Sequence, residues 1–251
     1  MESLNNSVLR ACFILDLFTP AKTEWSLKEI ATKCEIGMTT AMPLLRSLEK
    51  AGYLERDDIT KMYRLGMKFV EKSRIKLDSL NIIDCSDALL KQMSEQFGVN
   101  THLAVLDNGE IVYLSRHAAL VHSLVPSYVG KRLPVYCTAL GKAILANCAS
   151  SQVDQILEKQ TFHSYTPNTV KDAEAFRAIL ETVRANGYAT DDEEHQMGSY
   201  CISAPIFSST GTVCAAISAS IVKTEERLKI VPELILAVKN CAAKISKEMG
   251  Y

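Results

Sequence analysis

The densest cluster of side chains able to do chemistry is the run 191–195, Asp-Asp-Glu-Glu-His, which Cys201 follows six residues later. Carboxylate, imidazole and thiolate groups are all ligands that zinc accepts. The spacing of these groups matches none of the usual zinc motifs, however, and an acidic run of this kind is typical of a solvated loop. We therefore expect no metal and no cofactor at this segment.

Motifs of catalysis are missing from the sequence. It has no G-x-S-x-G nucleophile elbow, no Walker phosphate loop, no G-x-G-x-x-G dinucleotide motif and no H-E-x-x-H zinc motif. The eight cysteines form no C-x-x-C pair, and without a recognisable signal peptide they are typical of reduced, mostly buried thiols. We predict no catalytic residues and a cytoplasmic location.

Composition and charge narrow the function classes further. The 251 residues are 47% hydrophobic and 23% charged, as in a folded globular protein, and no apolar run approaches the ~20 residues of a membrane span. The net charge of −1 gives no bulk attraction to nucleic acid. Residues 36–76, however, hold nine Lys or Arg against five Asp or Glu, which indicates a local surface for an anionic partner.

The elements that would carry this basic segment are short helices. Apolar residues at spacings of three and four predict a helix over 8–18. Ser26 and Glu29 form the capping-box pattern that opens a second helix. We expect Thr39 and Thr40 to cap a third helix that runs through residue 51.

Two short runs after the third helix, 53–56 and 62–65, predict a β-hairpin. Three helices followed by a hairpin are typical of a winged helix-turn-helix, whose third helix enters the major groove of DNA. A small helical bundle with a β-appendage would show the same periodicity. We place this domain at 1–66 and an exposed, charged linker helix at 67–80.

The remaining residues, 81–251, predict an α+β sensor domain with an antiparallel sheet and with helices at one side. Asn108-Gly109 is a strong signal for a tight hairpin turn between strands, and Gly187 is expected to end a helix. The expected strands are 99–106, 110–114, 120–125, 201–207 and 212–221, and the expected helices are 82–97, 139–147, 152–159, 173–186 and 225–249.

Short motifs distributed along nearly the whole chain carry a family resemblance. They are Gly52-Tyr53-Leu54, Tyr63-Arg64-Leu65-Gly66, Thr101-His102-Leu103-Ala104, Gly130-Lys131-Arg132-Leu133-Pro134, Thr138-Ala139-Leu140-Gly141-Lys142-Ala143, the 187–194 run and Cys201-Ile202-Ser203-Ala204-Pro205-Ile206-Phe207. In order and spacing they resemble the IclR family of bacterial transcription regulators. The resemblance implies a winged helix-turn-helix, a GAF-like domain that binds a small metabolite, and a homodimer or homotetramer on duplex operator DNA.

The resemblance, together with the basic segment, places the DNA-binding residues on the third helix and the hairpin. They are Thr39, Thr40, Met42, Arg46, Lys50, Arg56, Lys61 and Arg64. Two positions that are commonly basic in the family are Met38 and Pro43 here, and we expect Pro43 to delay the start of the helix or to change its setting. These two residues leave open an alternative, a metabolite sensor or interaction protein with weak or no DNA binding.

The family's effector cavity maps by motif onto Ala139, Leu140, Asp191, Cys201, Ser218 and Ser220. Free N–H groups at a helix start favour a carboxylate, and alternate serines on a strand face the same side. We therefore expect a small anionic metabolite, such as a carboxylic or sugar acid, and a Cys201 thiol that lines the cavity without acting as a nucleophile. An enzyme built on this domain is disfavoured.

Overall fold

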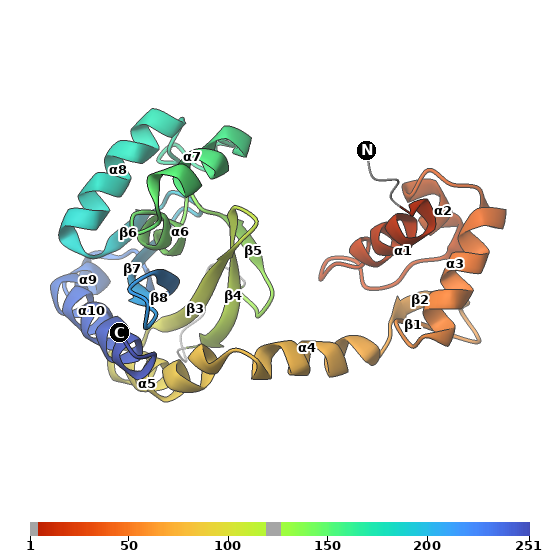
Figure 1. Ribbon diagram of the computed structural model, residues 1–251, viewed down its shortest axis with the longest axis horizontal. Coiled ribbons are helices and arrows are strands. Elements are labelled where there is room, and N and C mark those ends of the chain that lie inside the picture. The colour runs from red at the N-terminus through yellow and green to blue at the C-terminus, as the bar shows by residue number, and fades with distance from the viewer. Residues whose placement is uncertain (1–4, 119–126) are drawn as a thin grey trace. The chain divides into compact units, whose positions relative to one another are not determined.

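The computed structural model describes residues 5–118 and 127–251, so the strand predicted at 120–125 lies outside the described residues (Figure 1). The chain divides into two compact units, Met1–Ser79 and Leu80–Tyr251. The mixed helix and sheet content, with a helix-turn-helix first and an antiparallel sheet second, confirms the predicted fold class.

The first unit has the element order predicted for a winged helix-turn-helix. Its elements are α1 (Asn6–Asp16), α2 (Leu27–Lys33), α3 (Met38–Lys50), β1 (Leu54–Arg56), β2 (Tyr63–Leu65) and α4 (Lys68–Asp78). The capping box of α2 is confirmed, since the Glu29 N–H donates to Ser26 Oγ at 3.3 Å and the Ser26 N–H donates to the Glu29 carboxylate at 2.9 Å. Ile14, Ile30 and Leu45 meet in the core between the helices.

The start of α3 differs from the prediction. The helix begins at Met38 with Gly37 as its N-cap residue, and no side chain caps it, so the expected caps Thr39 and Thr40 are wrong. Pro43 lies inside α3 and does not delay it. A proline removes one i to i−4 hydrogen bond, but burial of residues on the inner side of the helix, such as Leu45 at 0% exposed, holds the segment in place.

The second unit is built on an antiparallel six-stranded sheet in the order β5-β4-β3-β8-β7-β6. The strands are β3 (Asn100–Asp107), β4 (Glu110–His117), β5 (Arg132–Pro134), β6 (Ala189–Asp192), β7 (Ser199–Phe207) and β8 (Val213–Val222). The turn between β3 and β4 is confirmed, because Asn108 and Gly109 have φ angles of 51° and 83°. The short strands β5 and β6 were not predicted.

Helices cover both faces of this sheet (Figure 1). They are α5 (Asn81–Phe97), α6 (Ala139–Leu145), α7 (Ser150–Lys159), α8 (Ala173–Asn186), α9 (Glu225–Leu228) and α10 (Val231–Glu248). Leu103 packs in the core with α5 and α10, whereas its neighbour Ala104 packs in the core with α6 and α8. The expectation of helices at one side is therefore wrong, because both faces of the central strands are apolar. The helix predicted at 225–249 is two helices, with Pro232 in the first turn of α10.

Candidate functional site

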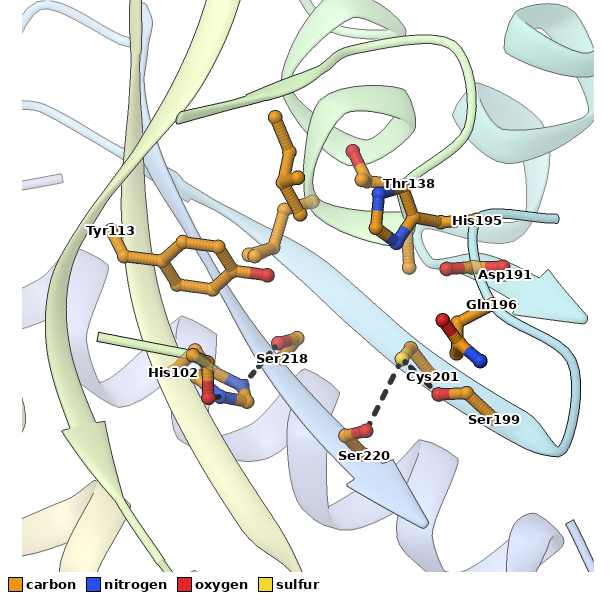
Figure 2. A pocket seen from close by; sticks show the side chains of 14 residues that line it. His102, Tyr113, Thr138, Asp191, His195, Gln196, Ser199, Cys201, Ser218 and Ser220 are labelled. Carbon is orange, nitrogen blue, oxygen red and sulfur yellow. Dashed lines mark hydrogen bonds between the residues drawn. The ribbon is translucent and has the colours of Figure 1, made fainter. Parts of the chain in front are cut away.

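A small polar cavity lies in the second unit, against the sheet and the start of α6 (Figure 2). It leaves about 40 Å³ for the centres of water-sized molecules. All of the residues expected to bind an effector line it, namely Ala139, Leu140, Asp191, Cys201, Ser218 and Ser220. The other lining residues are His102, Tyr113, Ser127, Leu133, Thr138, His195, Gln196 and Ser199.

The start of α6 forms one wall of the cavity. Thr138 is its N-cap residue, and its hydroxyl accepts from the Gly141 N–H at 3.1 Å and donates to the Pro134 carbonyl at 3.1 Å. Ala139 and Leu140 follow, and their N–H groups have no acceptor among the described residues. A side chain at Gly141 would collide with the carbonyl of Val135, so glycine allows α6 to lie this close.

The wall formed by β3 and β8 carries a neutral imidazole between two hydroxyls. His102 Nε2 lies 2.9 Å from Ser127 Oγ, and its Nδ1 lies 3.4 Å from Ser218 Oγ. Burial lowers the pKa of His102 to about 3, with a smaller contribution from nearby Arg116. The Tyr113 ring contacts this imidazole edge-on at 5.0 Å between centroids. His102 is thus uncharged at neutral pH and offers one donor and one acceptor.

The third wall, on β7 and β8, carries a thiol (Figure 2). The Cys201 thiol donates to Ser220 Oγ at 3.3 Å, and Ser199 Oγ lies 3.6 Å from the sulfur. Burial raises the pKa of Cys201 to about 12. The thiolate is the reactive form of cysteine, so this arrangement favours an unreactive, cavity-lining thiol.

Two members of the acidic run, Asp191 and Glu194, are buried, whereas Asp192 is exposed, so the interpretation of the whole run as a solvated loop is corrected for these two residues. Asp191 lies on β6 at 5% exposed, and Glu194 is 9% exposed. Glu194 forms a buried ion pair with Lys142 of α6, and its backbone carbonyl accepts from the Thr169 hydroxyl at 2.6 Å. The sequence alone does not indicate that Lys142 lies beside Glu194. The attraction of its ammonium group offsets the desolvation cost of burying the Glu194 carboxylate.

Asp191 titrates near neutrality in this setting. Burial raises the pKa of Asp191 to about 7, although nearby Lys142 acts in the opposite direction. Its carboxylate accepts from the Glu194 N–H at 2.8 Å. Within the described ranges, 5–118 and 127–251, no group of three His, Cys, Asp or Glu side chains could hold a metal ion.

Most of the cavity residues that the sequence reasoning missed had no local signal. Thr138 is the exception, because a threonine directly before a predicted helix is a candidate N-cap. His102 lies in the cavity because it pairs with Ser218 in the register of β3 and β8. That register joins residues more than one hundred positions apart, and a single sequence does not reveal it.

The residues expected to bind DNA are all exposed in the first unit. Thr39, Thr40, Met42, Arg46 and Lys50 lie on α3, and Arg56, Lys61 and Arg64 lie on the hairpin of β1 and β2. Arg64 is paired with Asp57 at 3.1 Å and with Glu24 at 3.5 Å. Within the part of the chain that is described, no ion pair engages Arg46 or Lys50.

An exposed recognition helix joined to a sensor unit with a polar cavity defines a DNA-binding transcriptional regulator with an effector-binding domain. The chain matches the model of the IclR helix-turn-helix domain over residues 7–58 and that of the bacterial transcriptional regulator IclR C-terminal domain over residues 75–247. The chain belongs to the IclR family.

Named relatives agree with this assignment. The chain is 31% identical over 245 residues to the HTH-type transcriptional regulator XynR of Escherichia coli K12, covering 98% of this chain and 97% of that protein. The crystal structure of Thermotoga maritima IclR matches at TM-score 0.78 and 30% identity, over 98% of this chain and 99% of that one. An IclR homologue from Microbacterium hydrocarbonoxydans, complexed with 4-hydroxybenzoate, shares the fold at TM-score 0.85 and 24% identity, over 97% of this chain and 99% of that one.

The matched C-terminal family model is that of bacterial transcriptional regulators, and XynR is a transcriptional regulator, so the chain is a regulator of this family and not an enzyme. Among the described residues, none of the helices is both long enough and apolar enough to pass through a membrane.

Proposed function

We propose that this regulator binds duplex operator DNA as a homodimer and that a small anionic metabolite in the cavity changes its affinity for that DNA. In this proposal 1–66 is the DNA-binding domain, 67–80 the linker helix and 81–251 the effector-binding domain. The observation that carries the proposal is the convergence of the six expected effector residues, from α6, β6, β7 and β8, on one cavity whose lining includes many polar side chains.

The cavity chemistry supports an anion with hydroxyl groups nearby. The N–H groups of Ala139 and Leu140 are donors at the positive end of α6, and Ser218 and Ser220 add hydroxyls. A carboxylate close to Asp191 would favour the protonated form of that residue, so binding should be tighter below its pKa of about 7. The 4-hydroxybenzoate held by the Microbacterium protein also carries a carboxylate.

The size of the cavity supports a small ligand. Its 40 Å³ corresponds to roughly three water molecules at 10–15 Å³ each. We therefore expect short hydroxy and keto acids to bind more tightly than long-chain or multi-ring acids.

Calorimetry of the full chain tests the ligand class. The probes are acetate, glycolate and pyruvate, each compared with its neutral amide, and gluconate serves as a longer hydroxy acid that should bind more weakly than glycolate. Acids should bind and amides should not, and Ser218→Ala should weaken binding while Ser208→Ala, in an exposed turn, should not. If only the amides or neutral aromatic compounds bind, the anion assignment is wrong.

A gel shift with the DNA upstream of the gene tests the regulator itself. The expected result is a retarded complex that an effective acid strengthens or dissolves. Exposed apolar residues on α1, Val8 at 59% and Phe13 at 58%, support self-association, which light scattering would measure. A protein that binds the acid but no duplex would be the alternative sensor or interaction protein.

A further inference from the structure

The first part of α3 has two exposed methionines and no charged side chains. Residues 38–45 contain no charged side chain and no Asn or Gln. Met38 is 55% exposed and Met42 is 39% exposed, whereas the inner side of the same helix is packed through Leu45. Core packing therefore does not account for either methionine.

These methionines lie on one ridge of the helix. Met38, Met42 and Arg46 follow at four-residue intervals, so their side chains are neighbours along the helix surface. The ridge begins at the first residue of α3, and N-terminal residues of a recognition helix are the ones that contact base edges. Arg46 ends the ridge with a cation that suits a phosphate.

The chemical groups on the base edges determine which base the side chains of this ridge can recognise. Guanine is read by Arg or Lys, adenine by Asn or Gln, and cytosine by Asp or Glu, whereas the thymine 5-methyl group is read by apolar contact. Ser47, one turn further on, already donates its hydroxyl to the Pro43 carbonyl at 2.9 Å. Of the four bases, thymine is the one that the two thioether side chains match.

We propose that Met38 and Met42 recognise thymine methyl groups in the major groove of the operator. This inference rests on the proposed operator binding and adds the base that is read. The cations Arg46 and Lys50 on the same helix favour a polyanionic duplex over a second protein chain as the occupant of this surface.

The test uses the full chain and a duplex that it selects from a random pool. Each thymine of that duplex is replaced in turn by deoxyuridine, which keeps the pairing and the O4 acceptor but lacks the methyl group. Binding is measured by fluorescence anisotropy. We expect about a fourfold loss of affinity at each contacted thymine, the effect of removing one buried methyl-sized group.

Variants assign the contact to individual residues. Met42→Ala and Met38→Ala should each weaken binding to the thymine duplex and abolish the response to deoxyuridine at one position. Met42→Leu, which keeps the apolar bulk, should retain the response. Met197→Ala removes a methionine that is 51% exposed in the other unit, and it should retain the full response.

The outcomes separate this proposal from operator binding itself. If a duplex is selected but no deoxyuridine weakens its binding, or if both alanine variants keep the response, thymine recognition is wrong while operator binding stands. If the alanine variants instead change the oligomeric state in light scattering and keep the response, the surface belongs to a second copy. If no duplex is selected, operator binding fails and thymine recognition fails with it.

Discussion

The two candidate surfaces of this regulator are built in opposite ways. The residues expected to contact DNA come from one helix and one hairpin, within 39–64, and all are exposed. The cavity residues come from strands and helices spread over 102–220, and most are buried. A substitution on the DNA surface therefore changes one exposed side chain and little else. A substitution in the cavity changes packing, charge and stability together.

The difference between buried and exposed substitutions should be largest at the Lys142–Glu194 ion pair. Lys142→Met leaves the Glu194 carboxylate buried without its cation, and Glu194 Oε2 already has no hydrogen-bond partner among the described residues. We expect the sensor unit to lose about 3–5 kcal/mol of unfolding free energy, measured by urea denaturation.

The control for that experiment is an exposed pair in the same unit. Arg177 and Asp154 lie 2.6 Å apart with side chains about half exposed, so Arg177→Met should cost less than about 1 kcal/mol. Adding Glu194→Gln to Lys142→Met should recover part of the loss, because it removes the unpaired charge. Equal effects of the two single variants would show that burial does not distinguish the pairs.

The next largest effect concerns Asp191 and pH. Burial raises its pKa in the folded state to about 7, so the folded protein holds a proton that the unfolded chain releases near its ordinary pKa of 3.8. The contribution of Asp191 to the unfolding free energy is fully present below pH 4 and is lost as the pH rises from 4 to 7. The loss should be roughly 2–4 kcal/mol.

Asp191→Asn should remove that pH dependence while keeping an oxygen acceptor for the Glu194 N–H. Urea denaturation at pH 4 to 8 is the measurement. The titratable groups that interact with Asp191 are Lys142, Glu194, Cys201, Tyr113 and Cys137. The exposed carboxylate Asp154 provides the control, since Asp154→Asn should leave the dependence intact. A wild-type protein whose stability is flat between pH 4 and 7 would contradict the raised pKa.

The same contrast explains which features could be predicted from the sequence. The capping box at Ser26 and Glu29, the Asn108-Gly109 turn and the helix end at Gly187, where φ is 72°, depend on neighbours within a few residues. The predicted helix 173–186 matches α8 for the same reason. The six residues expected to bind an effector were chosen because motifs of the family mark them, and all six line one cavity.

Features set by distant partners were not predictable. The strands β5 and β6 have three and four residues and exist only because longer strands pair with them. Lys142 and Glu194 are 52 positions apart, so nothing local indicated that Glu194 of the acidic run is buried. The late start expected for α3 failed in the same way, because tertiary packing of Leu45 outweighs the local effect of Pro43.

Cys201 tests the cavity with a smaller change. Cys201→Ser should leave folding and DNA binding intact and change the affinity for an effective acid by about 1–2 kcal/mol, as expected for one altered buried polar contact. Calorimetry measures the affinity, and Cys12→Ser, at an exposed cysteine, should have no effect. Stoichiometric zinc in the purified protein, lost in Cys201→Ser, would instead make Cys201 a metal ligand.

The smallest effect distinguishes two arginines of the DNA surface. Arg46 has no ion-pair partner among the described residues, whereas Arg64 is paired with Asp57 and Glu24. An arginine that meets a phosphate releases about one counterion, so Arg46→Ala should lower the slope of log affinity against log salt by about 1. Arg64 must first break its ion pairs with Asp57 and Glu24, and the charge of these carboxylates offsets part of its attraction to phosphate.

Arg64→Ala should therefore lower that slope by less than half as much as Arg46→Ala, and its effect should be uniform across DNA sequences because a phosphate contact carries no base information. Anisotropy titrations between 50 and 200 mM salt measure both slopes, with Lys159→Ala on α7 as a control outside the DNA-binding unit. Equal slopes for the two arginine variants would mean that Arg64 exchanges its carboxylate partners for phosphate at no cost. Exposed ion pairs contribute little to stability, so a difference between the slopes would show that they still reduce the charge available to DNA.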